Sequence, residues 1–260
     1  MKKVFVALAN KEYIPYSKSL FYNVKDKWDG DFLLMVPEED KDSYDFTEFT
    51  DKGIEVFFAP TILGCEHPDF YKFHLFTEYF TDWDWVFYCD LDVLFFNKID
   101  LQLEERDKSF YAKEDGLPFE KQFSGVNKKL LKKFNKDKSF QACYMLINPK
   151  DMVKDNMFDK LMNCYYEYHV FYNITNELTL AQSILNIPID WYDLGNEFIN
   201  TYQRHNDLNW DEELLKGDFQ DDRDYFEEGI ISVHFGRFSA QWDKNNLRFY
   251  PIWKEYNDKF

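Results

Sequence analysis

The sequence WVFYCDLDVLFF, residues 85–96, places two aspartates inside an otherwise apolar run. An apolar run of this length predicts a strand that is buried on both faces, as in a parallel sheet. A buried carboxylate is costly unless a partner compensates its charge, so Asp90 and Asp92 need a reason to be there. Four other Asp-x-Asp pairs occur in the chain, but in polar, turn-like surroundings where water is a sufficient partner. The apolar context therefore marks Asp90 and Asp92 as candidate site residues.

The segments before this run predict an α/β domain. Apolar strand patterns cover residues 3–9, 31–37, 53–60 and 83–92, and helical patterns cover residues 16–24 and 69–80. Strands that alternate with helices in this order favour a parallel, doubly wound sheet. Ligands of such sheets bind beyond the carboxyl ends of the strands. Asp90 and Asp92 lie at that end of the fourth predicted strand.

The second half of the chain is less regular. We predict strands over residues 139–149 and 229–236, with His234 near the end of the later one, and helices over residues 151–171 and 176–185. No internal repeat, Gly/Ser linker or low-complexity segment divides the chain. We therefore expect a single domain over residues 1–260, with halves at 1–100 and 101–260.

The bulk composition limits the partners and the compartment. The chain has 48 acidic against 31 basic side chains and a net charge of −17, which argues against a nucleic-acid surface. Its four cysteines form no CxxC pair, which is typical of reduced thiols in the cytoplasm. The first residues lack the apolar core of a signal peptide, and no stretch reaches the ~20 apolar residues of a membrane span. We expect a cytoplasmic protein without a membrane span.

The aspartate pair suggests a metal site. Carboxylates at i and i+2 of a strand point to the same face and can converge on one hard divalent cation. His234 is the candidate third ligand, and an imidazole ligand favours Mn²⁺, with Mg²⁺ as the alternative. The plainer interpretation of His234 is a hydrogen-bonded, half-buried residue. The carboxylate pair makes the ligand role the stronger interpretation.

Several segments, taken in order, resemble one family. The run KFHLFTEYFTDWDWVFYCDLDVLFF resembles the helix and DxD strand of GT-A glycosyltransferases, in particular the glycogenin-like, family 8-type nucleotide-sugar transferases. Weaker similarities follow in VALANKEY, ACYMLINP, AQSILN and HFGRFSAQW. The resemblance covers most of residues 1–245. It implies the α/β GT-A fold, a mostly parallel, doubly wound sheet flanked by helices.

The resemblance also implies roles for individual residues. Asp90 and Asp92 would bind Mn²⁺ and the sugar nucleotide, and His234 would complete the metal site. The other implied donor-binding residues are Ala7, Ala9, Asn10 and Tyr13 at the nucleobase, with Lys72 and Leu91. Gln182 would face the reactive side of the donor sugar. Glu177 is a second catalytic candidate, as a base for the acceptor hydroxyl, although an acidic residue in the first turn of a helix is also stabilised by the helix dipole.

Some positions depart from the family pattern. Position 181 is alanine instead of aspartate, and the strand sequence ACY, residues 142–144, lacks the family's glycine. The lysine expected to hold the diphosphate is missing, and Arg237 or Lys244 could replace it. These departures affect the substrate and the catalytic face more than the fold.

We expect a metal-dependent transfer of a sugar from a nucleoside diphosphate sugar, UDP-linked by resemblance, to a hydroxyl of a glycan or protein. His234 and Gln182 favour retention of anomeric configuration, whereas Glu177 as a base would give inversion. Two alternatives stay open. A HAD-like phosphatase would use Asp90 as a nucleophile, and a non-catalytic relative would bind carbohydrate without a metal.

Overall fold

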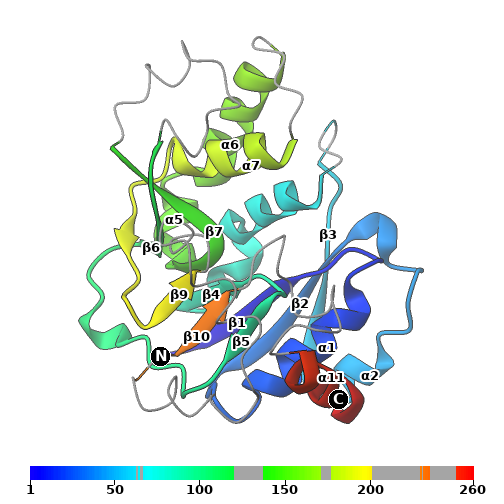
Figure 1. The fold of residues 1–260 in the computed structure, drawn as a ribbon. Coiled ribbons are helices and arrows are strands. Elements are labelled where there is room, and N and C mark those ends of the chain that lie inside the picture. The colour runs from blue at the N-terminus through cyan, green and yellow to red at the C-terminus, as the bar shows by residue number, and fades with distance from the viewer. Residues whose placement is uncertain are drawn as a thin grey trace.

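The computed structural model describes residues 1–62, 64, 67–119, 137–170, 177–200, 229, 231–234 and 250–260. Its main element is a seven-stranded sheet in the order β3-β2-β1-β4-β7-β6-β8 (Figure 1). The first four strands in this order are parallel to one another. They are β1 (Lys3–Leu8), β2 (Asp31–Pro37), β3 (Ile54–Ala59) and β4 (Trp85–Cys89). The predicted parallel, doubly wound half is confirmed.

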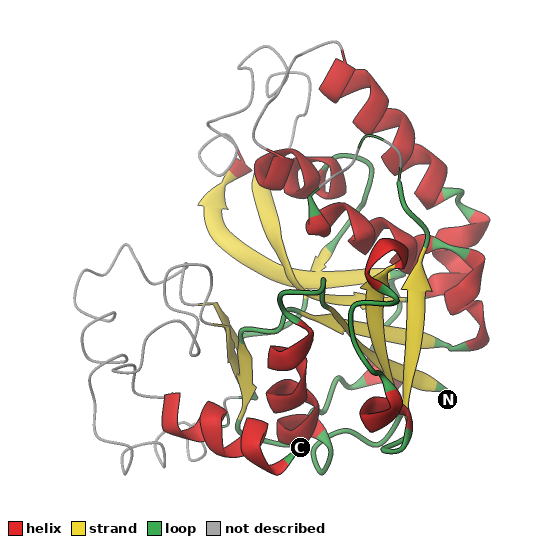
Figure 2. Cartoon of the chain, turned by 90° about the vertical axis from the view of Figure 1, so that its right-hand side faces the viewer, coloured by secondary structure: helices red, strands yellow, loops and turns green. Residues whose placement is uncertain are grey.

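The sheet is covered on both faces (Figure 2), which explains why its strands read as unbroken apolar runs. Side chains of β1 alternate between two cores, with Val4 and Val6 in one and Phe5 and Ala7 in the other. The core that contains Phe5 is closed by α1 (Ile14–Val24) and α2 (Thr47–Thr50). The opposite core is closed by the aromatic segment before β4 and by α6 (Met157–Tyr165) and α7 (Glu177–Asn186).

The second half of the sheet is mixed, with two antiparallel pairs and one short parallel pair between β6 and β8. Strand β7 (Lys138–Ile147) pairs antiparallel with β4 and with β6 (Phe110–Pro118), and the two-residue β8 (Tyr192–Asp193) extends the edge. The sequence analysis missed β6 because its outer part, KEDG, is polar, and its pairing with β7 is interrupted by register shifts. A small second sheet joins β5 (Val93–Phe95), β10 (Ser232–His234) and β9 (Phe198–Asn200).

Two predicted helices differ from the structure. Residues 69–80, predicted as one amphipathic helix, form two 3₁₀ helices, η2 (Pro68–Phe76) and η3 (Glu78–Asp82). Every residue from Phe70 to Phe76 is buried, so this segment has no polar face, and extended Thr77 separates the two pieces. The predicted helix over 151–171 is divided into α5 (Pro149–Lys154), α6 and the π-helical η5 (Tyr166–Val170), with left-handed Asn156 between α5 and α6.

The remaining described elements are peripheral. Short 3₁₀ turns are η1 (Glu38–Asp40) and η4 (Leu103–Glu105). Helix α11 (Tyr250–Lys259) lies beside α1 (Figure 1), where the Ser19 hydroxyl donates to the carbonyl of Trp253 over 3.1 Å. Within the described chain, no helix has the length and apolar character that crossing a membrane requires.

Candidate active site

Two segments far apart in sequence build the centre of the site. Strand β4 ends at Cys89, so Asp90 and Asp92 lie in the turn between β4 and β5 and not within the strand itself. Strand β10 runs antiparallel to β5, and its register pairs His234 with Val93. One ligand atom each from Asp90, Asp92 and His234 therefore lies within 4.8 Å of the other two. The structure brings together the three residues predicted to bind the metal.

His234 and Asp92 form an ion pair in this site. Nε2 of His234 lies 3.1 Å from Oδ1 of Asp92. Burial lowers the pKa of His234, but Cys143 and Asp92 outweigh it and raise that pKa well above its usual value. Burial in turn raises the pKa of Asp92, yet the His234 charge and hydrogen bond hold it below the ordinary value. A cation bound by Nε2 of His234 would replace this contact with Asp92.

Lys72 supplies the second positive charge. Its ammonium lies 2.9 Å from Asp90, 2.9 Å from Asp69 and 3.2 Å from the carbonyl of Ala142. The side chain is buried; burial alone lowers the pKa of Lys72, but Asp69 and Asp90 raise it above its usual value. Asp90 also accepts a 2.6 Å hydrogen bond from the Tyr88 hydroxyl. Lys72 is therefore a structural partner of the DxD turn. Its expected contact with the donor stays a prediction.

The residues present fit a hard divalent cation. Two carboxylates and one imidazole are a ligand set that suits Mn²⁺. Burial and the charge of Asp92 raise the pKa of Asp90, whereas the charge of Lys72 lowers it. The resulting pKa of Asp90 is above its usual value. A cation between two neighbouring carboxylates relieves that repulsion. The charges of Asp69, Asp90 and Asp92 exceed that of Lys72 by two once His234 is neutral, which matches a dication.

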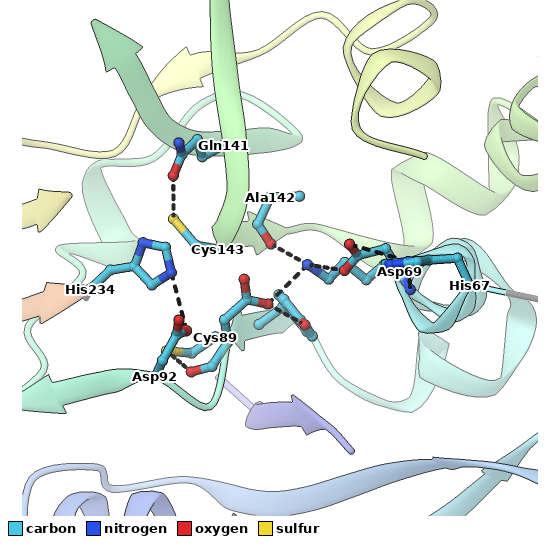
Figure 3. A network of polar contacts seen from close by, with 11 residues as sticks. His67, Asp69, Cys89, Asp92, Gln141, Ala142, Cys143 and His234 are labelled. Atoms are coloured by element: carbon cyan, nitrogen blue, oxygen red, sulfur yellow. Dashed lines mark hydrogen bonds and ion pairs between the residues drawn. The ribbon is translucent and has the colours of Figure 1, made fainter. Parts of the chain in front are cut away.

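Strand β7 supports the site from the side. The backbone amide of Asp90 donates to the carbonyl of Cys143 over 3.0 Å. The sulfur of Cys143 lies beside the His234 ring, and the thiol donates toward Oε1 of Gln141 over 3.8 Å (Figure 3). The sequence analysis assigned no role to Gln141, Cys143 or Asp69. Only Asp69 carried a local signal, its i, i+3 spacing from Lys72.

The residues expected at the nucleobase occupy different environments. Ala7, Ala9 and Leu91 are buried in the core on the α1 side of the sheet. Tyr13 is 42% exposed. Asn10 follows β1, and its buried Oδ1 has no hydrogen-bond partner in the described part of the chain. An unpaired buried carbonyl is suited to accept an N–H group from a ligand.

The expected catalytic residues lie on α7. Gln182 is half-buried, and its backbone carbonyl accepts a 2.9 Å hydrogen bond from Nδ2 of Asn186. The Asn186 side chain also bonds to both backbone groups of Phe140 on β7, which ties α7 to the sheet. Glu177 is the first residue of α7. Their catalytic roles stay predictions.

Several predicted features lie outside the described residues. They are Arg237, Lys244 and the rest of the segment HFGRFSAQW that follows His234. The side chain expected from sequence to hold the diphosphate, Arg237 or Lys244, is therefore also outside the described residues.

Asp115 on β6 is a buried carboxyl that the sequence analysis did not single out. It is fully buried, and no group in the described chain meets either of its oxygens with good hydrogen-bond geometry. Burial raises the pKa of Asp115 to about 7, although the nearby Gln141 amide opposes this rise. A pKa above that of the unfolded chain means that stability falls as pH rises from about 4 to 7.

We expect Asp115→Asn to remove this pH dependence. Relative to the native chain, the variant should gain roughly 2–3 kcal/mol in free energy of unfolding between pH 5 and pH 8, since only the carboxyl must ionise while buried. Urea unfolding at both pH values measures the gain. Asp190→Asn, at an exposed position, serves as the control. An equal effect of Asp115→Asn at the two pH values would contradict the burial argument.

Comparisons with known proteins identify the fold. No protein-family model and no curated protein match the sequence. The galactosyltransferase LgtC, solved with donor and acceptor sugar analogs, aligns with a TM-score of 0.63 at 15% identity over 99% of this chain and 96% of LgtC. The glycosyltransferase GlyE of Streptococcus pneumoniae TIGR4 aligns with a TM-score of 0.59 at 18% identity over 99% of this chain. The bifunctional glycosyltransferase WbbM gives 0.61 at 15% identity over 98% of it.

The alignment covers only 60% of the GlyE chain and 49% of the WbbM chain. At these identities the likeness concerns the fold. The central sheet, flanked by helices and mostly parallel in its first half, matches these structures. The chain has the GT-A fold of glycosyltransferases.

Proposed function

We propose that the chain is a metal-dependent glycosyltransferase that moves a sugar from a nucleoside diphosphate sugar to a hydroxyl of a glycan or protein. The observation that carries this proposal is the convergence of Asp90, Asp92 and His234 at the carboxyl end of β4 within a GT-A fold. The pairing of Asp92 with His234 favours a metal-ligand role over the phosphatase alternative, in which Asp90 would be a nucleophile.

Asp90, Asp92 and His234 would hold the cation, which is Mn²⁺ in this proposal. Bound there, it would offset the charge of the diphosphate and stabilise the departing phosphate oxygen. Lys72 keeps Asp90 in place from the opposite side through its 2.9 Å ion pair. This ion pair holds the Asp90 carboxylate in position before the donor binds, so less reorganisation is needed on binding.

The donor would lie along the carboxyl ends of the parallel strands. The first hundred residues would bind the nucleotide, with the unpaired Oδ1 of Asn10 accepting an N–H group from the base. Uracil has such a group, and the family resemblance favours UDP. Residues 101–260 would bind the acceptor.

Gln182 would face the donor sugar from α7. An amide does not act as a base at neutral pH, so retention would leave the departing diphosphate oxygen to take the proton of the acceptor hydroxyl. Glu177 acting as the base would instead give inversion. The anomeric configuration of the product decides between these two courses.

A thermal-shift panel of nucleoside diphosphate sugars, with and without Mn²⁺, tests the proposal. We expect a UDP-sugar to raise the melting temperature only when Mn²⁺ is present, because the diphosphate needs the cation in an acidic site. Asp82→Asn, at an exposed position in another Asp-x-Asp pair, should keep this shift. A panel in which no nucleotide sugar binds, or in which binding ignores Mn²⁺, would overturn the assignment.

A further inference from the structure

Cys143 touches both parts of the candidate metal site. Its backbone carbonyl accepts from the amide of Asp90, and its sulfur lies beside the imidazole of His234 (Figure 3). The residue is buried, at 2% exposure. The strand sequence ACY, residues 142–144, lacks the glycine of the family that it resembles, so a side chain is present at every position. The contact between thiol and imidazole is therefore a property of this chain.

The two contacts of the His234 ring lie at different edges. Nε2 is 3.1 Å from Asp92, and Figure 3 shows the sulfur of Cys143 on the other side of the ring from that carboxylate. A histidine that binds a metal through one nitrogen keeps a proton on the other nitrogen, and that N–H needs an acceptor. Cys143 is placed to supply this acceptor when Nε2 turns from Asp92 to a cation.

Gln141 makes the sulfur available for this role. The Cys143 thiol donates toward Oε1 of Gln141 over 3.8 Å, so its S–H group points along β7. A thiol has one weak donor and a weakly accepting sulfur. With the donor directed to Gln141, the lone pairs of the sulfur face the imidazole. Gln141 is itself 8% exposed, which shields this chain of contacts from water.

We propose that Cys143 is a positioning residue that holds His234 in the tautomer and orientation needed to bind the divalent cation. The inference rests on the proposed function, because it concerns the same metal site. It adds a residue that acts through His234 and does not itself bind the metal. Partners of this kind typically change metal affinity by 10–100-fold, and we expect the lower end because sulfur is a weak acceptor.

The test is a Mn²⁺ titration of the full chain followed by electron paramagnetic resonance, without any sugar. Cys143→Ala and Cys143→Val should each weaken Mn²⁺ binding about tenfold, since neither offers an acceptor. Cys143→Ser should stay within about threefold of the native chain, because a hydroxyl replaces both functions of the thiol. The same three substitutions at Cys164, a partly buried thiol on α6, are the matched control and should leave the affinity within about threefold of native.

The outcomes separate hydrogen bonding from packing. Rescue by serine but not by valine supports the proposal, whereas a valine variant that binds like the native chain would overturn it, since valine fills the space without the hydrogen bond. If the alanine variant fails to fold, the serine and valine pair decides. Absence of Mn²⁺ binding by the native chain defeats the proposed function as well. If the native chain binds Mn²⁺ and all three Cys143 variants bind it equally well, only the role of Cys143 is contradicted.

Discussion

Replacing Asp92 by asparagine should lower sugar transfer by about 10³-fold or more. The substitution removes one anionic ligand of the candidate metal site and leaves the buried His234 without its ion-pair partner. A bound cation supplies several kcal/mol of stabilisation to a departing phosphate, and each ~1.4 kcal/mol corresponds to a tenfold change in rate. The measurement is the initial rate of nucleoside diphosphate release from the donor that the thermal-shift panel selects, at saturating Mn²⁺.

Asp82→Asn is the control, because Asp82 is exposed and belongs to another Asp-x-Asp pair. It should keep the native rate. That result would show that removing a carboxylate elsewhere in the chain does not slow sugar transfer. Raising Mn²⁺ further should not restore Asp92→Asn, since the missing ligand also positions the ion. A rate for Asp92→Asn within about threefold of native would remove Asp92 from the reaction.

Replacing Lys72 by methionine should destabilise the metal-free protein by about 3–5 kcal/mol. The ammonium is buried at 2% exposure and compensates Asp69 and Asp90, each at 2.9 Å. Without it, the carboxylates of Asp69 and Asp90 stay in a poorly solvated site and lose their shared ammonium partner, while methionine keeps most of the apolar packing. Equilibrium unfolding in urea, with chelator present, measures the loss.

Mn²⁺ should restore more stability to Lys72→Met than to the native chain, because a dication beside Asp90 replaces part of the missing charge. Lys150→Met provides the comparison. Its ion pair with Asp84 is also short, at 2.7 Å, but both side chains are about half exposed, and such pairs contribute about 0–1 kcal/mol. Equal losses for the two lysines would mean that burial of the Lys72 network has no energetic consequence.

The parallel half of the fold could be predicted because its strands are buried on both faces. The apolar runs of β1, β2, β3 and β4 are a direct consequence of that burial, and all four were predicted. Strand β6 was missed, since its polar outer residues give no strand pattern. The 3₁₀ helix η2 was predicted as part of an α-helix, because burial all around the segment hides the period from which the helix type is inferred.

The candidate site was predictable where its chemistry is concentrated in one segment. Asp90 and Asp92 contrast with their apolar neighbours, and His234, which ends a strand, became a candidate ligand because that pair calls for a third one. The supporting contacts were not predictable, because they arise from strand pairing. Cys143 reaches Asp90 through the β4–β7 pair, and His234 reaches the turn through the β5–β10 pair. The local sequences ACY and SVH contain no pattern from which those neighbours could be predicted.

Anomalous diffraction from a crystal soaked in Mn²⁺ tests the central claim, the gathering of Asp90, Asp92 and His234 around one dication. We predict a single strong peak at this position, about 2.0–2.2 Å from one oxygen of each aspartate and from a ring nitrogen of His234, with the ring turned from Asp92 to the ion. A map without that peak, in which His234 stays paired with Asp92 and Lys72 with Asp90, would contradict the account.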